Sequence, residues 1–409
     1  TNLEKSNNQT AISNEQLFDF IKHFHLFSCD LDIKHSINVS LLRSLIDKYN
    51  HDSHGVWTKV IDEVLSYNKN AGTITPNSLP EELRNAFKPQ SHESIPIKFT
   101  SQAVISRHWS QHDDVLALAK FNLFGAWDEK NDADIEIVST IIQEDYKVWL
   151  NKIKAILRLL DTPISLTNGV WQVIDRKILW ETLGSQIFDN DVKILKECAL
   201  TVLLKRNSKF DIPPNQRYLA FGDKVLLHSD YLRKGIAESL ALIGSQSDLL
   251  TNCSSNTPES VANSTVSSLF KNADWLLWGS LNSLLPTLAE AAPSCFLHSV
   301  EHALKQSPCP FYALFQEECS DFMREENYMT GLLWALEGIA WDKNHLTNVC
   351  LKLAELATHD CGGKWTNRPA NSIQAILLPW LPQTIASVEA RKGTLSALQR
   401  EFPNVAWNI

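Results

Sequence analysis

The sequence lacks the short motifs of the commonest nucleotide and nucleophile sites. No G-x-x-x-x-G-K-[ST], G-x-G-x-x-G, G-x-S-x-G or C-x-x-C pattern occurs in its 409 residues. Gly362-Gly363-Lys364 superficially resembles a phosphate loop, but the spacing is wrong, and Trp365 stands where Ser or Thr would bind magnesium. We interpret it as a glycine turn that ends a helix. The chain is therefore predicted not to be an enzyme and to have no catalytic, cofactor-binding or metal-binding residues.

Clustered cysteines and long apolar runs are also missing. The eight cysteines stand singly, at positions 29, 198, 253, 295, 309, 319, 350 and 361, so the sequence indicates neither a zinc ribbon nor a disulfide framework. No apolar run approaches the roughly 20 residues that span a bilayer, and the first ten residues carry no apolar signal core. A cytoplasmic protein with reduced thiols, and no membrane partner, is expected.

Positive charge is in the minority. The chain has 38 basic and 47 acidic residues, for a formal net charge of -9. General binding to a phosphate backbone rests on dense Lys and Arg, so nucleic acid is not expected as a partner. The chain begins with Thr1 rather than Met. We expect it to be part of a longer protein.

Apolar residues are plentiful, at 44% of the chain, and most recur at the three- and four-residue spacing of helices. Helices joined by short loops, with no large sheet to cover, must bury their apolar faces on one another. The fixed periods of tetratricopeptide and ankyrin repeats are absent, so any array is irregular. The prediction is an all-α fold, an irregular α-solenoid of antiparallel helix pairs similar to tetratricopeptide or HEAT arrays.

Helices are expected throughout the chain, with ends placed to within a few residues. One of them is predicted to run unbroken over residues 273–291. Beyond residue 100 the expected helices cover about 113–124, 132–143, 145–160, 176–185, 190–206, 230–243, 257–271, 273–291, 294–306, 328–341, 343–358, 370–379 and 384–401.

A loop rich in Ser, Asn and Asp, residues 245–256, predicts a division of the array. After it, Thr257-Pro258-Glu259 is a helix start, in which the Thr257 hydroxyl is expected to cap the free amides. The predicted organisation is an N-terminal helical segment or linker to an upstream module, then a first and a second half of the array: residues 1–100, 101–250 and 251–409.

One stretch departs from helical spacing. Residues 164–166 and 170–173 alternate between apolar and polar side chains on either side of Asn168-Gly169. Asn-Gly supplies the two positive φ angles of a tight hairpin turn. A small β-hairpin is predicted near residues 164–173.

Two histidine pairs invite a metal interpretation. His298, Glu301 and His302 fit the H-x-x-E-H pattern of inverted zinc peptidases, with two imidazoles for the metal and a carboxylate as base. The apolar residues of this helix place all three on its solvated side, so the zinc hydrolase is a remote alternative that the metal content of the protein would test. His108 and His112, beside Asp113 and Asp114, are better explained as a polar helix start.

Aromatic residues and one crowded loop are the remaining candidates. Most of the 13 tryptophans, including the helically spaced Trp275 with Trp278 and Trp334 with Trp341, are predicted to be core. The loop between two helices at residues 360–371 holds four candidates for either ligand contact or bracing of the loop: Trp365, Asn367, Arg368 and Asn371.

Several strings of the sequence resemble the C-terminal helical region of large bacterial STAND-type NTPases of the antiviral Avs kind. The resemblance runs from about residue 120 to the end of the chain. The matching strings are 125–129 (GAWDE), 168–171 (NGVW), 233–240 (RKGIAESL), 273–275 (ADW), 327–337 (NYMTGLLWALE) with 340–342 (AWD), 362–372 (GGKWTNRPANS), 378–380 (LPW) and 382–384 (PQT).

The resemblance implies a sensor. In that family an effector, often a nuclease, precedes an NTPase module, and a C-terminal array of tetratricopeptide-like helices binds a phage protein such as the terminase large subunit or the portal. Binding then drives oligomerisation and activates the effector. This chain would correspond to the sensor alone, in a bacterial cytoplasm, with ATP and magnesium held by its own upstream NTPase module.

A second interpretation comes from a different class of function. The helical array would be a scaffold, an autoinhibitory element or an oligomerisation module of the larger protein, with no viral ligand of its own. It predicts no affinity for a phage protein, which separates it from the sensor.

Overall fold

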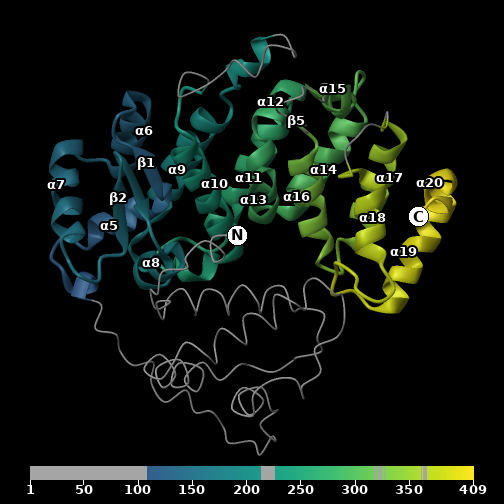
Figure 1. Cartoon of the computed structure of the whole chain (residues 1–409). Coiled ribbons are helices and arrows are strands. Elements are labelled where there is room, and N and C mark those ends of the chain that lie inside the picture. The colour runs from purple at the N-terminus through teal and green to yellow at the C-terminus, as the bar shows by residue number, and fades with distance from the viewer. Residues whose placement is uncertain are drawn as a thin grey trace, which may run out of the picture. The chain divides into compact units, whose positions relative to one another are not determined.

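The computed structural model describes residues 108–212, 226–316, 319–320, 325–326, 328–360, 362 and 366–409 (Figure 1). All of them belong to the second of the chain's two compact units, Val104–Ile409. The N-terminal segment predicted for residues 1–100 lies outside this description. Across the described residues, the predicted all-α fold with one small hairpin is confirmed. Within that part of the chain, no helix has the length and apolar character that crossing a membrane requires.

The main helices pack in two rows, and within each row the helices lie side by side in chain order (Figure 1). Each helix contacts the next of its own row, and helices of opposite rows also pack together, as α10 does with α11 and α16 with α17. The first row is α5 (Leu116–Phe124), α10 (Asp230–Ser245), α13 (Leu285–Ala291), α16 (Thr330–Ala340) and α18 (Pro369–Leu377). The second row is α6 (Asp132–Ile142), α9 (Asp189–Leu203), α11 (Thr257–Phe270), α14 (Pro293–Leu304), α17 (Leu346–Thr358) and α19 (Val388–Glu401).

Shorter elements flank the rows. Helix α7 packs on α5 and α6, α8 packs on α5, α12 packs on α15, and α20 packs on α19. Their bounds are α7 (Tyr146–Leu157), α8 (Arg176–Leu183), α12 (Trp275–Ser280), α15 (Pro310–Gln316) and α20 (Pro403–Trp407). The 3-10 turns are η2 (His108–Gln111), η3 (Gly184–Gln186), η4 (Ser208–Asp211), η6 (Ser247–Leu249) and η7 (Asn282–Leu284).

A three-stranded antiparallel sheet of order β1-β3-β2 lies against α10 and α6. The predicted hairpin is its β2 (Ile164–Thr167) and β3 (Val170–Val173), with Asn168 and Gly169 at φ angles of 57° and 93° in the turn. Strand β1 (Ala126–Asp128) was not predicted, because three residues are too few to show an alternating pattern. A second pair, β4 (Cys319–Ser320) with β5 (Glu325–Glu326), is shorter still.

One hydrophobic core runs the length of both rows, from Trp109 in η2 to Leu398 in α19. Helices α10 and α13 lie on either side of residue 250 and pack directly on each other. The core is therefore continuous across the point at which the sequence predicts a division of the array.

The helix predicted over residues 273–291 is broken, and this prediction is wrong. The chain forms α12, then η7, then α13. Pro286 sits in the first turn of α13, where its missing N–H costs nothing, whereas inside a continuous helix its ring would clash with the carbonyl four residues earlier. Pro286 therefore gives a physical reason why one continuous helix cannot form here.

The start of α11 also differs from the prediction. The helix begins at Thr257, but Asn256 is its N-cap, with a φ of 64°, and no side-chain hydrogen bond caps it. The hydroxyl of Thr257 is thus not the cap. Glu259 accepts a hydrogen bond from Ser247 Oγ at 2.9 Å, which ties the helix start to the preceding turn.

Candidate protein-interaction surface

The string at residues 233–240 is a packing motif. Arg233 is buried and donates hydrogen bonds to the carbonyl oxygens of Val202, Lys205 and Ser280, at 3.3, 3.3 and 3.0 Å. Three carbonyl oxygens surround one guanidinium, so the side chain joins α10 to the ends of α9 and α12. Burial lowers the pKa of Arg233. Its task is structural.

Arg176 joins other matched residues in the same way. Its guanidinium donates to the carbonyl oxygen of Gly235 at 2.6 Å and to the Glu238 carboxylate at 3.2 Å. It also donates to Ser239 Oγ at 2.5 Å, so α8 is anchored to α10 through one side chain. Burial lowers the pKa of Arg176, and the Glu238 carboxylate opposes that shift. The matched string at residues 233–240 thus joins α10 to α8, α9 and α12.

The string at residues 327–342 contains a glycine that the packing requires and two tryptophans that the packing leaves exposed. Gly331 is required by the fold, because its N–H donates to Asn282 Oδ1 at 2.8 Å and a Cβ would overlap the Asn282 backbone carbonyl. Three residues further along α16, Trp334 is 58% exposed, and Trp341, which follows the helix, is 56% exposed. The prediction that these two tryptophans are core is wrong.

These tryptophans are exposed because the region of α16 has more apolar residues than its buried positions can hold. Its buried positions are filled by six aliphatic side chains, Leu332, Leu333, Ala335, Leu336, Ile339 and Ala340. Positions 334, 337, 338 and 341 fall within about 100° of one another around a helix of 3.6 residues per turn. We call the face formed by Trp334, Glu337, Gly338 and Trp341 the α16 face. Its two indoles are not needed to fill the core.

Further exposed apolar side chains lie in the connection between α18 and α19. The backbone N–H of Ile385 and the hydroxyl of Thr384 both donate to the carbonyl oxygen of Trp341, at 3.1 and 3.3 Å. This connection is therefore held against the C-terminal end of α16. Its exposed members are Trp380, Leu381 and Ile385, at 80%, 69% and 63%.

The predicted loop at residues 360–371 places its arginine inward. Arg368 is buried, at 8% exposure, and its Nη1 donates to Asp360 Oδ1 at 3.1 Å. Gly362 N–H donates to the same oxygen at 2.9 Å. The Asp360 carboxylate therefore joins the two ends of the loop through Arg368. This geometry favours bracing over ligand contact for Arg368.

The other predicted residues of that loop differ in position. Asn371 is exposed on α18, and its Nδ2 donates to the carbonyl oxygen of Thr366 at 2.5 Å. Asn367 is half-buried. Trp365 lies outside the described residues, as do Gly363 and Lys364. Of the three predicted residues that the structure describes, Asn371 is the one whose side chain is exposed.

The H-x-x-E-H motif sits on the solvated side of α14, as its apolar residues predict. His298 and His302 are exposed. Glu301 accepts hydrogen bonds from Lys305 Nζ at 2.6 Å and from Lys352 Nζ at 3.2 Å, and these two lysines lower the pKa of its carboxyl to about 2. A carboxylate held between two ammonium groups is a weak proton acceptor. The geometry does not favour a hydrolytic role for this motif.

The second histidine pair forms a turn. His112 Nδ1 accepts a hydrogen bond from the Asp114 N–H at 3.1 Å, two residues before α5 begins. The side chain of His108 is outside the description. Among the described residues, no three His, Cys, Asp or Glu side chains are grouped as a metal site would require.

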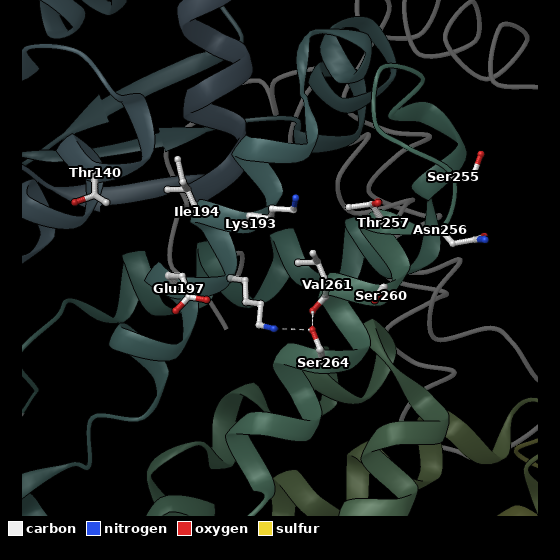
Figure 2. Close-up of a pocket in the computed structure, with 11 residues that line it drawn as sticks. Thr140, Lys193, Ile194, Glu197, Ser255, Asn256, Thr257, Ser260, Val261 and Ser264 are labelled. Atoms are coloured by element: carbon white, nitrogen blue, oxygen red, sulfur yellow. Dashed lines mark hydrogen bonds between the residues drawn. The ribbon is translucent and has the colours of Figure 1, made fainter.

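A hollow of about 800 Å³ opens between α9 and α11 (Figure 2). Helix α9 lines it with Lys193 and Lys196, and α11 lines it with Thr257 and Ser264. Lys196 Nζ donates to Ser264 Oγ at 3.0 Å, so a direct hydrogen bond already bridges the two helices. We interpret the hollow as a gap between neighbours of the second row.

No protein-family model matches this chain, and no curated protein and no solved structure is significantly similar to it. Among the described residues, the α16 face and the α18–α19 connection carry large apolar side chains, three of them tryptophans, that the fold leaves exposed. The sequence signal for it is the excess of apolar residues in 330–341 over what one buried helix face needs.

Proposed function

We propose that this chain is a protein-binding helical module, the target-recognition region of a larger bacterial anti-phage STAND NTPase. In this proposal it binds a conserved phage protein, the terminase large subunit or the portal. Binding then triggers oligomerisation and activates an effector, and the upstream NTPase module holds ATP and magnesium. The observation that supports a binding function is the apolar surface of α16 and the α18–α19 connection.

Physical reasons favour this surface as a binding site. Contiguous exposed apolar groups cost free energy in water, and in folded proteins they mark interaction sites more often than scattered exposed residues do. Tryptophan is also enriched among the residues that dominate binding energy, because it buries a large rigid area at little cost in conformational entropy. Trp334, Trp341 and Trp380 are exposed tryptophans of this kind.

The test is a pull-down of purified terminase large subunits and portal proteins by the full chain at moderate salt. Saturable binding near one to one is the expected result. Leu160→Ala is the control for substitutions on the α16 face such as Trp334→Ala. Leu160 is a fully exposed aliphatic residue in the first third of the described chain. Its removal is expected to leave binding unchanged.

Failure of every candidate to bind a demonstrably folded sample would contradict the sensor. The same exposed surface would then be assigned to contacts inside the parent protein, as a scaffold or oligomerisation module. A complex with the parent's own upstream module that Trp334→Ala disrupts would be the positive evidence for that alternative.

A further inference from the structure

Glycine is used in two ways along the first row of helices. At Gly235, Gly244 and Gly331 an added Cβ would overlap a backbone carbonyl oxygen of Phe124, Ala291 and Asn282 respectively. These three glycines allow neighbouring backbones to approach closely. At Gly338 an added Cβ would meet no atom within 4 Å. The fold itself gives no reason for a glycine there.

A glycine inside a helix is not neutral. It costs about 1 kcal/mol relative to alanine, because it loses more backbone freedom on folding. At three positions of the same row that cost accompanies a close backbone contact. The fourth, Gly338, leaves an equivalent space open on the exposed side of α16. The space fits the close approach of a second polypeptide.

The two indoles stand on either side of that space. Trp334 is four residues before Gly338 and Trp341 three residues after it, so their Cα atoms are about 10 Å apart along the helix axis. Two aromatic rings at that separation can lie above and below one flat or slender group. Arginine and lysine side chains are attracted to the faces of indole rings.

The charge of the α16 face selects such a group. Glu337 is the one ionisable residue of α16, and within the described part of the chain its carboxylate has no ion pair or hydrogen bond. Asp342 follows Trp341 directly, with its Oδ1 accepting from the Asn344 N–H at 2.9 Å. Lys343 is the nearest cation in sequence. The whole chain carries a formal charge of -9.

We propose that the α16 face receives one basic side chain of a partner polypeptide, arginine above all, from a segment whose backbone crosses α16 at Gly338. The guanidinium lies between Trp334 and Trp341 and pairs with Glu337, and apolar residues beside it in the partner cover the outer edges of the indoles. The inference rests on the proposed binding function and specifies its chemistry.

The test follows the two indoles directly. The full chain is labelled with 5-fluorotryptophan, and the resonances of residues 334 and 341 are assigned from the Trp334→Phe and Trp341→Phe variants by fluorine NMR. The probes are three capped pentapeptides with a central arginine, glutamine or glutamate flanked by leucines. We expect both resonances to shift together and saturably with the arginine peptide, at about tenfold lower concentration than with the glutamine peptide.

Matched variants separate the site from general effects. Gly338→Leu fills the space between the indoles, and Glu337→Gln removes the counter-ion without changing shape. Both are expected to weaken binding of the arginine peptide about tenfold or more. Gly393→Leu is the control, because Gly393 is also inside a helix with no atom within 4 Å of an added Cβ. It is expected to bind as the unmodified chain does.

The proposal is overturned if the two resonances fail to shift with the arginine peptide at up to about 10 mM, a concentration that detects very weak binding. It is also overturned by equal responses to all three peptides, or by equal effects of Gly338→Leu and Gly393→Leu. A phage protein that binds Gly338→Leu normally would keep the sensor and reject this site. Arginine preference without any phage ligand would keep the site and reject the sensor.

Discussion

Tryptophan has opposite environments in the first and last parts of the described chain. Trp127, Trp149 and Trp171 are fully buried, and each indole N–H donates a hydrogen bond, to Tyr146 Oη, to the carbonyl oxygen of Ala117 and to Glu129 Oε2. Their rings pack on one another, with Trp127 and Trp171 stacked at 5.5 Å across β1 and β3. In the last part, Trp334, Trp341, Trp380 and Trp407 are exposed.

This difference separates tryptophans that stabilise the fold from tryptophans that the fold leaves exposed. A buried tryptophan whose N–H is also paired contributes both apolar area and a satisfied donor, so it stabilises the fold. An exposed tryptophan contributes little to stability, and its large apolar surface remains available to a partner. The first group explains, without a ligand, why the strings at residues 125–129 and 168–171 each contain a tryptophan.

The largest expected effect compares one member of each group. Trp127→Ala is expected to destabilise the protein by about 3–5 kcal/mol, because it opens a cavity in a fully packed cluster. Trp334→Ala is expected to change stability by no more than about 0.5 kcal/mol. Urea denaturation followed by far-ultraviolet circular dichroism measures both. Similar losses for the two variants would end the distinction between the groups.

The glycines of α16 sharpen the comparison within a single helix. Gly331→Ala is expected to destabilise by roughly 1–3 kcal/mol, since its Cβ would press on the Asn282 carbonyl. Gly338→Ala is expected to stabilise by up to about 1 kcal/mol, because alanine favours the helix and meets nothing. Thermal melts test both expectations: the melting temperature should fall for Gly331→Ala and rise for Gly338→Ala.

Arg368 tests the bracing interpretation of the loop before α18. Arg368→Ala removes the cation that pairs with the Asp360 carboxylate. The free energy of unfolding is expected to fall by about 1–3 kcal/mol. Asn371→Ala, nearby but exposed, serves as the control and is expected to be nearly neutral. Unchanged stability of Arg368→Ala combined with weaker ligand binding would instead make it a contact residue.

Substitution of Glu301 is expected to change stability least, and the size of the change should depend on pH. Hydrogen bonds from Lys305 and Lys352 lower the pKa of its carboxyl from 4.5 to about 2. The folded carboxylate thus takes up a proton less readily than the unfolded one, so its stabilisation is complete above pH 4.5 and is lost as the pH falls towards 2. Glu301→Gln is expected to cost roughly 1 kcal/mol or less at neutral pH, because the pair is partly exposed. Comparing urea midpoints at pH 7 and pH 3 should show the difference between the two proteins shrinking.

The fold could be predicted where a local signal was sufficient. Helical spacing identified most helices of both rows, and Asn168-Gly169 identified the hairpin, because each signal acts within a few residues. Strand β1 is held by pairing with β3 across more than forty residues of sequence, and local spacing carries no trace of that contact. Pro286 was a local signal that the apolar period of residues 273–291 concealed.

The exposed surface that we propose for binding was harder to predict, because the exposure of a side chain depends on which other elements pack around it. Trp334 and Trp341 have helical spacing among Leu and Ala, which is typical of a buried stripe. Only the positions of η7, α13, α17 and α18 around α16 show which side is covered. Likewise, the ion pair of Asp360 with Arg368 depends on how the loop closes, although both residues were within the predicted loop.

The most direct test of the account is calorimetric titration of purified terminase large subunits and portal proteins with the full chain and with its Trp334→Ala/Trp341→Ala variant. At least one phage protein is expected to bind saturably, and the double variant is expected to bind at least about tenfold more weakly at an unchanged melting temperature. Binding that the double variant retains in full would contradict the assignment of the α16 face, and no binding by the folded chain would contradict the sensor itself.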